Sequence, residues 1–360
     1  MTEYVGLTWD HPRGRRALEE ASGELAGGDT IRWEVQSLEG FESAPIDELC
    51  ERYDLVVLDH PHLGDALENR SIRPLDELFG EAELEAWRRS AVGPTIASYT
   101  MEGRLWALPL DAATQVSARR VDAVPVAPRS WDELPDRSAL SLAGPHAFLS
   151  ACSIAVSLGA DPFADGAFGR EAGLRTLEIM QSIADRAPAG SERLNPIGLL
   201  ERMRDQGDID FIPLVYGYVN YSSGAIRFGA PPQSVRPGST IGGTGIAVSR
   251  RAAVGPALID HLRWLLSPET QAGFIPRNAG QPGLRSAWRD PAVDEAAHGF
   301  YSATLDTIEH AWIRPRFAGY IPFQQAASAI VRDALSGTTT HADALDAIDQ
   351  RYRAALEEAS

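Results

Sequence analysis

The sequence contains no lysine, and all 33 of its basic residues are arginine. Without a lysine amine the chain has no group for Schiff-base chemistry, for anchoring pyridoxal phosphate or for a P-loop. The formal net charge of −17 also leaves no basic excess to attract nucleic acid or an anionic membrane surface. These function classes are therefore excluded, and we expect no nucleic-acid partner and no cofactor.

Cysteines are scarce as well, since the sequence has only Cys50 and Cys152. Both lie in apolar helical patterns, which are typical of buried structural thiols. No apolar run reaches the length of about 18 residues that a membrane span needs, so we expect no membrane insertion. We also expect no signal peptide in the given sequence, because a strand pattern begins almost directly after Met1. We expect a periplasmic or extracellular protein if a leader has been removed, and a cytoplasmic one if the sequence is complete.

Length and periodicity point to two α/β domains. A chain of 360 residues exceeds what a single hydrophobic core usually supports. Strand patterns at residues 4–9, 30–35 and 54–58 alternate with helical periodicity. This βαβαβ order predicts a parallel sheet with a ligand crevice at the carboxyl ends of its strands.

The segment EGRLWALPLDAATQ, Glu102 to Gln115, marks the predicted passage between the domains. A turn at Glu102-Gly103 precedes a short apolar run that leads to Pro109. Because proline lacks the amide hydrogen that a central strand donates, we expect regular strand pairing to stop there.

Two later patterns carry expectations about local structure. Ser130 to Leu134 shows a capping box, in which Ser130 caps a helix and Glu133 reaches back to the cap amide. Gly242, Gly243 and Thr244 precede a strand pattern, and their amides either bind an anion or allow a second crossing between domains. We favour the second interpretation.

In this order the pieces resemble family 1 extracellular solute-binding proteins, which serve carbohydrate ABC transporters and include maltose-binding protein. Five motifs carry the resemblance across nearly the whole chain. They lie at residues 103–120, 128–134, 242–249 and 257–271, and in the closing segments 314–320, 335–337 and 342–345.

The resemblance implies a type II periplasmic-binding-protein-like α/β fold, in which two lobes are joined by crossing strands and close on a ligand. It places residues 1–111 and 245–298 in the first lobe, and residues 112–244 and 299–360 in the second. It implies a small-molecule ligand, an ABC permease as partner and a monomer. Arg119-Arg120 stands where the family has Tyr-Asn, so we expect an acidic or carboxylate-bearing solute more than a plain oligosaccharide.

Candidate site residues follow from strand ends and from the resemblance. Two similar loops end the first and third strands, namely Trp9-Asp10-His11-Pro12 and Asp59-His60-Pro61-His62. A tyrosine run follows a later strand, and further candidates lie in the crossing segments and in two loops near Arg277 and Arg316. The predicted ligand-binding residues are Trp9, His11, Asp59, His60, Asp111, Gln115, Arg119, Tyr216, Tyr218, Tyr221, Gly243, Thr244, Arg277, Arg316 and Tyr320.

Non-catalytic binding of a small polar solute is the leading interpretation. One alternative is a ferric-iron-like metal site made by His11, Asp59 and a tyrosine of the 216–221 run. Another is an enzyme that uses Asp59-His60 or Asp10-His11 for acid-base chemistry. The sequence has no nucleophile elbow, P-loop or HExxH motif to support catalysis, so we expect no enzyme and no bound metal.

Overall fold

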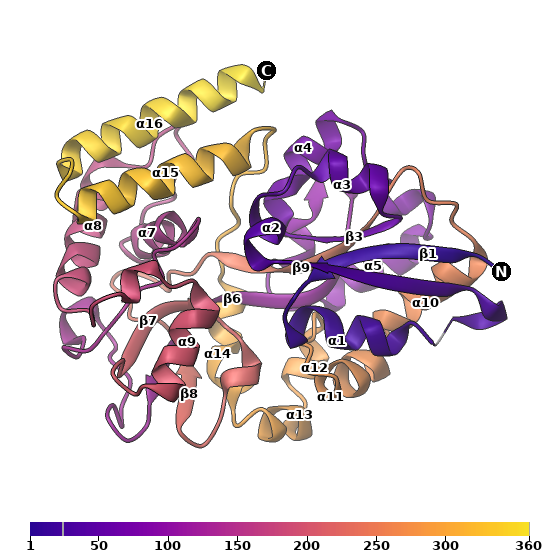
Figure 1. The fold of residues 1–360 in the computed structure, drawn as a ribbon, viewed down its shortest axis with the longest axis horizontal. Helices are drawn as coiled ribbons and strands as arrows, with labels where there is room; N and C mark the ends of the chain where they lie inside the picture. Colours follow the sequence, from indigo (N-terminus) through magenta and orange to yellow (C-terminus); the bar gives the residue numbers. More distant parts are fainter. Residues whose placement is uncertain (24, 360) are drawn as a thin grey trace. The chain divides into compact units, whose positions relative to one another are not determined.

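The computed structural model describes residues 1–23 and 25–359. The chain forms two compact units (Figure 1). Unit 1 contains Met1–Ala113, Gly242–Ala296 and Arg314–Ile321, and unit 2 contains Thr114–Ile241, Ala297–Ile313 and Pro322–Ser360. The chain first passes between the units at Ala113–Thr114, then at Ile241–Gly242 and at Ala296–Ala297, and the sequence-based division into two lobes stays a prediction. Arg314–Ile321, however, returns to unit 1, whereas the sequence-based division placed it in the second lobe.

Unit 1 is built on the sheet order β2-β1-β3-β9. Strand β1 (Glu3–Trp9) is parallel to both β2 (Thr30–Gln36) and β3 (Leu55–Leu58), which confirms the predicted parallel arrangement. Strand β9 (Ile241–Val248) runs antiparallel to β3. The helices of this unit are α1 (Pro12–Ala21), α2 (Leu38–Ser43), α3 (Ile46–Arg52), α4 (Leu63–Glu68), α5 (Glu81–Ser90), α6 (Thr95–Ser98), α10 (Pro256–Leu265), α11 (Ile275–Arg277), α12 (Arg285–Trp288) and α13 (Pro291–Ala296).

Unit 2 receives the long strand β6 (Leu108–Arg120), which pairs antiparallel with β7 (Phe211–Tyr216) and β8 (Ile226–Gly229). Every residue of its helix α7 (His146–Ser157) is buried. That helix has apolar residues on most sides and serines on one, which suits a position inside the unit. The other helices are α8 (Arg170–Ala184), α9 (Pro196–Asp205), α14 (Phe300–Glu309), α15 (Tyr320–Leu335) and α16 (His341–Glu358).

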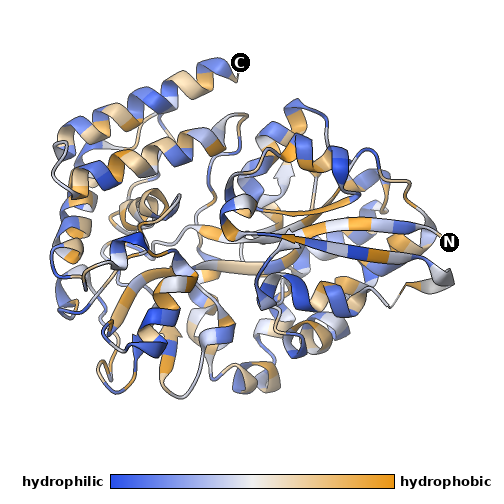
Figure 2. Ribbon diagram, viewed as in Figure 1, coloured by the Kyte–Doolittle hydropathy of each residue, from blue (hydrophilic) through white to orange (hydrophobic). Residues whose placement is uncertain are grey.

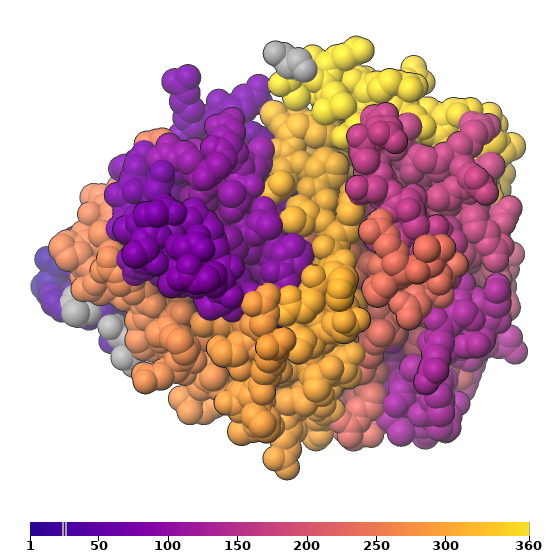
Figure 3. Space-filling model, turned by 180° about the vertical axis from the view of Figure 1, so that it is seen from behind, coloured from indigo at the N-terminus to yellow at the C-terminus, as the bar shows by residue number. Residues whose placement is uncertain are grey.

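The C-terminal helix α16 packs on α8 within unit 2. Hydrophilic and hydrophobic bands alternate along it, as Figure 2 shows, and its Tyr352 ring stacks on Phe163 with ring centroids 4.1 Å apart. The Asp349 carboxylate accepts the Phe168 amide at 2.7 Å. Figure 3 shows these yellow C-terminal residues beside the magenta ones of the α8 region. Among the helices of residues 1–23 and 25–359, none has both the length and the apolar character needed to cross a membrane.

Three local expectations were wrong. Pro109 does not end strand pairing, since β6 runs through it, and its place as the second strand residue is one where a missing amide is tolerated. The capping box at Ser130 does not form, because Glu133 accepts the Arg129 amide at 3.0 Å and the segment is only a 3-10 turn. Gly242 and Gly243 do not precede a strand but lie inside β9.

Candidate functional site

The loop after β1 forms a compact aromatic and cationic platform. His11 caps α1 by accepting the Arg13 amide on its Nδ1, and its ring lies parallel to Trp9 with centroids 5.3 Å apart. The Arg13 guanidinium lies 5.7 Å from the centroid of the Trp9 ring, a cation–π distance. Gly14 makes this packing possible, because a Cβ there would lie 2.2 Å from Trp9 Nε1.

Arg13 also forms a buried ion pair with Asp111 of β6. Its Nε donates to Asp111 Oδ2 at 2.7 Å and its Nη2 donates to Oδ1, so the contact is bidentate. The two side chains are only 4% and 5% exposed. Burial raises the pKa of Asp111, and the Arg13 charge opposes that rise.

The loop after β3 holds a second ion pair. Asp59 accepts the His60 amide at 2.8 Å, which caps the turn His60–His62, and its other oxygen accepts from Arg314 Nη2. Burial acts to raise the pKa of Asp59, but the Arg314 and His60 charges hold it well below its usual value. The His60 ring is fully buried, with Nδ1 3.0 Å from Asp59 Oδ1. Burial, aided by the Arg314 charge, lowers the pKa of His60 to about 4, so its ring is neutral at pH 7.

Two aromatic residues join the two loops. The Phe41 ring on α2 lies 5.8 Å from the Trp9 ring, and its carbonyl accepts from His62 Nε2 at 3.1 Å. The Tyr99 hydroxyl donates to the Leu58 carbonyl at 3.1 Å. Burial and then the Asp59 and Asp111 charges raise the pKa of Tyr99 well above its usual value, so this hydroxyl lies within electrostatic reach of both ion pairs. The structure thus gathers the two loops, as predicted, into one cluster in unit 1.

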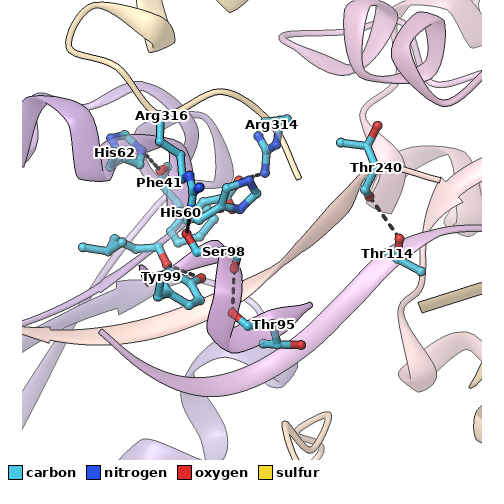
Figure 4. Close-up of polar contacts among 12 residues, drawn as sticks. Phe41, His60, His62, Thr95, Ser98, Tyr99, Thr114, Thr240, Arg314 and Arg316 are labelled. Atoms are coloured by element: carbon cyan, nitrogen blue, oxygen red, sulfur yellow. Dashed lines mark hydrogen bonds and ion pairs between the residues drawn. The ribbon is translucent and has the colours of Figure 1, made fainter. Parts of the chain in front are cut away.

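Arg316 lies beside His60 and Arg314 of this cluster, as Figure 4 shows. Arg316 Nη1 donates to the carbonyls of Ala97, Ser98 and Thr100 at 2.7, 2.8 and 3.0 Å, which ties the closing segment to the end of α6. Tyr320 is fully buried, with its ring 5.5 Å from that of Phe317. Arg277 is exposed at the end of α11, and none of the described contacts joins it to the cluster.

Two predicted site residues, Gly243 and Thr244, lie on β9 near the point where the chain enters unit 1. Gly243 has φ +100°, a conformation that favours glycine, and a Cβ there would lie 2.5 Å from the Asp111 carbonyl oxygen. Thr244 is buried beside it. Close backbone approach is therefore the reason for glycine at this position, and its service to a crossing between the domains stays a prediction.

Unit 2 brings the predicted tyrosines together in part. Tyr216 ends β7, with its ring 6.0 Å from that of His146. Tyr218 and Tyr221 form an edge-to-face pair 6.3 Å apart. The Tyr221 hydroxyl donates to Glu201 at 3.3 Å, and the Arg204 guanidinium lies 5.5 Å from its ring. We call Tyr216, Tyr218 and Tyr221 the tyrosine cluster. The Glu201 carboxylate and the Arg204 guanidinium both lie beside its Tyr221 ring.

The remaining predicted residues of β6 are held inside unit 2. Gln115 is almost fully buried and bonded to two serines of α7. Arg119 Nη1 donates to the Val124 carbonyl at 2.7 Å. Arg120 donates to the Gly207 carbonyl and pairs with Asp122 at 2.6 Å. The reason for expecting an acidic solute was this arginine pair, and that reason does not hold, because both guanidinium groups bind partners of their own unit.

The alternatives to solute binding gain no support from the geometry. Within residues 1–23 and 25–359 there is no group of three or more His, Cys, Asp or Glu side chains that could hold a metal ion. Asp59 and His60 do touch, but Asp10 pairs with Arg15 at 3.3 Å while His11 Nδ1 accepts the Arg13 amide. A predicted ligand site between two lobes concerns the relative placement of the units and stays a prediction.

Sequence reasoning missed four residues of the unit 1 cluster, namely Arg13, Phe41, Tyr99 and Arg314. Arg314 lies in one of the motifs that carry the resemblance, and Arg13 directly follows the His-Pro loop, so both had a local signal. Phe41 and Tyr99 had none, since each lies in a segment that only the fold brings to the strand ends.

The comparisons with known proteins agree on the architecture. No family model and no curated protein matches the sequence. Among solved structures, the maltose-bound MalE3 protein of T. maritima superposes with a TM-score of 0.83 at 18% identity, covering 98% of this chain and 99% of that one. The fold is that of ABC transporter solute-binding proteins.

Two further structures extend the likeness. A ribitol complex of an ABC transporter solute-binding protein from Agrobacterium radiobacter has a TM-score of 0.82 at 20% identity, with 98% of each chain covered. The GacH receptor of Streptomyces glaucescens, solved unliganded and with acarbose, has a TM-score of 0.81 at 15% identity over 100% of both chains. This solute-binding-protein fold therefore accounts for the whole chain.

Proposed function

We propose that the protein binds a small uncharged polyhydroxy solute, a sugar or an alditol, reversibly and without converting it. The observation that carries the proposal is the full-length likeness to the maltose, ribitol and acarbose complexes. We propose that the strand-end cluster of unit 1 supplies contacts to the solute.

The charges of the unit 1 cluster support an uncharged solute. Arg13 balances Asp111, and Arg314 balances Asp59. His11 and His60 are neutral at pH 7, because burial lowers the pKa of each to about 4. The charges within each ion pair therefore cancel, and the pairs offer charge-assisted hydrogen bonds to hydroxyl groups.

A thermal-shift screen tests the proposal against its rival. The panel holds neutral mono- and oligosaccharides and alditols on one side, and dicarboxylic and sugar acids on the other. A ligand at about one hundred times its Kd stabilises the folded state by about 2.7 kcal/mol, which such a screen detects. Stabilisation by the acids alone would overturn the proposal.

We further propose that the protein is a monomer outside the cytoplasmic membrane and delivers its solute to an ABC permease. Light scattering at a mass near 39.0 kDa checks the monomer. Fractionation of the native organism checks the compartment, and faster ATP hydrolysis by a reconstituted permease with loaded protein checks the partner. Mass spectrometry of solute recovered after long incubation checks that no conversion occurs.

A further inference from the structure

Buried hydroxyl and amide side chains gather where β6 and β9 enter unit 2. Ser150 and Ser153 lie one helical turn apart on α7, and both are fully buried. They face Gln115 of β6 and Thr240, the residue directly before β9, whose side chains are also buried. Such a group of polar side chains in a protein interior is stable only when its hydrogen bonds are satisfied.

The first set of bonds holds β6 to α7. Ser153 Oγ donates to Gln115 Oε1 at 2.5 Å, and Gln115 Nε2 donates to Ser150 Oγ at 3.3 Å. Both ends of the Gln115 amide are therefore fixed to one helix.

The second set holds the segment before β9 to the same helix. The Thr240 amide donates to Ser153 Oγ at 2.8 Å, and the Thr240 hydroxyl lies 2.9 Å from the same atom. Ser239 Oγ donates to the Gln115 carbonyl at 2.5 Å, and Thr114 Oγ1 donates to the Thr240 carbonyl at 3.1 Å (Figure 4). Ser153 is thus the shared point that joins both strands.

A third chain passage is tied to the same place. The Trp312 amide donates to the Ser239 carbonyl at 2.7 Å, and the Ile241 amide donates to the Trp312 carbonyl at 2.8 Å. Trp312 lies just before the chain returns to unit 1 at Arg314. The network therefore fixes three of the passages between the units on the side of unit 2.

The same strands are held separately on the side of unit 1. Arg13 pairs with Asp111, and Gln281 Nε2 donates to the Ala112 carbonyl at 2.5 Å. Strand β9 pairs with β3 from Gly245 onward. In β6 only Ala113 lies between the two sets of contacts, and in β9 only Gly242–Thr244, where Gly243 has φ +100°.

We propose that Ser153, Gln115 and Thr240 form a clamp that fixes the unit 2 ends of both crossing segments, so that bending of these two segments is confined to Ala113 and to Gly242–Thr244. Gln115 and Ser153 are positioning residues: they act on solute binding through the strands and do not touch the solute. This inference rests on the proposed function for its purpose, but its test needs no solute.

The test compares two serines of α7 that differ in what they hold. Ser153→Ala removes the point shared by the strands. Ser157→Ala is the matched control, because Ser157 Oγ is equally buried and accepts from Trp131 Nε1 and from the Ser234 amide, both at 3.0 Å, without touching either crossing strand. Denaturant unfolding of both variants shows that each still folds.

Two readouts are taken without ligand. Spin or fluorescence labels are placed at exposed Glu48 on α3 and Ala354 on α16, each substituted by cysteine, since Cys50 and Cys152 are buried and do not label. Amide hydrogen exchange is followed at Thr240. We expect Ser153→Ala to broaden the distance distribution between the labels and to speed exchange at Thr240 at least tenfold, while Ser157→Ala leaves both as in the parent.

Two outcomes would overturn the clamp. One is a distance distribution in Ser153→Ala that equals the parent's, and the other is equal broadening in both serine variants, which indicates general loosening of α7. Because neither readout depends on solute, failure of the clamp stays distinct from failure of the proposed function.

Discussion

Replacing His261 by leucine should make the free energy of unfolding less sensitive to acid. His261 lies on α10 with 3% of its surface exposed, and its ring is 5.7 Å from that of Trp264. Burial lowers its pKa from 6.5 to about 4, with no charged group contributing. The folded protein therefore keeps this ring neutral under conditions in which the unfolded chain protonates it.

The sign of the effect follows from proton linkage. Because the folded-state pKa lies below the unfolded one, the stability is fully present above pH 6.5 and is lost as the pH falls from 6.5 towards 4. At 1.36 kcal/mol for each pKa unit, the loss between pH 8 and pH 4.5 is about 2.5 kcal/mol. We expect the free energy of unfolding of the parent to fall by this much more than that of His261→Leu.

Urea unfolding at a series of pH values measures the difference. His261→Gln is the control, since it keeps a polar group but cannot titrate, and it should share the flatter pH profile of the leucine variant despite lower stability at pH 8. Parallel profiles for the parent and both variants would refute the reasoning.

Three further predictions concern the site. Asp111→Asn leaves the buried Arg13 charge without its counter-ion, and it should lower the free energy of unfolding in urea by about 3–5 kcal/mol. The double variant Arg13→Met with Asp111→Leu should recover most of that loss. Equal losses in the single and double variants would contradict the ion-pair account. Gly14→Ala brings a Cβ against the Trp9 ring and should cost about 1–3 kcal/mol with a change in tryptophan fluorescence, and an unchanged spectrum would show that the ring is not held there. Arg119→Ala should change solute affinity by less than about threefold in calorimetry, since its guanidinium binds the Val124 carbonyl, and a tenfold loss would restore the case for an acidic solute.

The sequence patterns that predicted the structure correctly were those with a direct physical cause. The apolar run Leu55–Leu58 and the alternation of strands and helices predicted the parallel sheet, and the polar residues that follow β1 and β3 were expected at one edge of it. Residues joined through the chain's own loops, such as Trp9 with His11 and Asp59 with His60, followed from that topology.

What failed depended on tertiary contacts that no local pattern encodes. Pro109 was expected to end a strand, but strand β6 includes it as its second residue. The hydrogen bonds that hold β6 in the sheet come from other residues of the strand. The bond from Arg119 to the Val124 carbonyl was not foreseen, because it depends on the fold, and the predicted ligand contact of Arg119 stays a prediction. Phe41 joins two loops only because α2 packs beside both, and Gln115 was read as facing the solute although α7 binds both ends of its amide.

Calorimetric titration of the unmodified protein at pH 7 tests the central claim most directly. The titrants are the neutral sugar or alditol that gives the largest thermal shift and the corresponding sugar acid. We predict one-to-one binding of the neutral solute, at least tenfold tighter than of the acid, with the solute recovered unchanged by mass spectrometry. Tighter binding of the acid, or recovery of a converted product, would contradict the account.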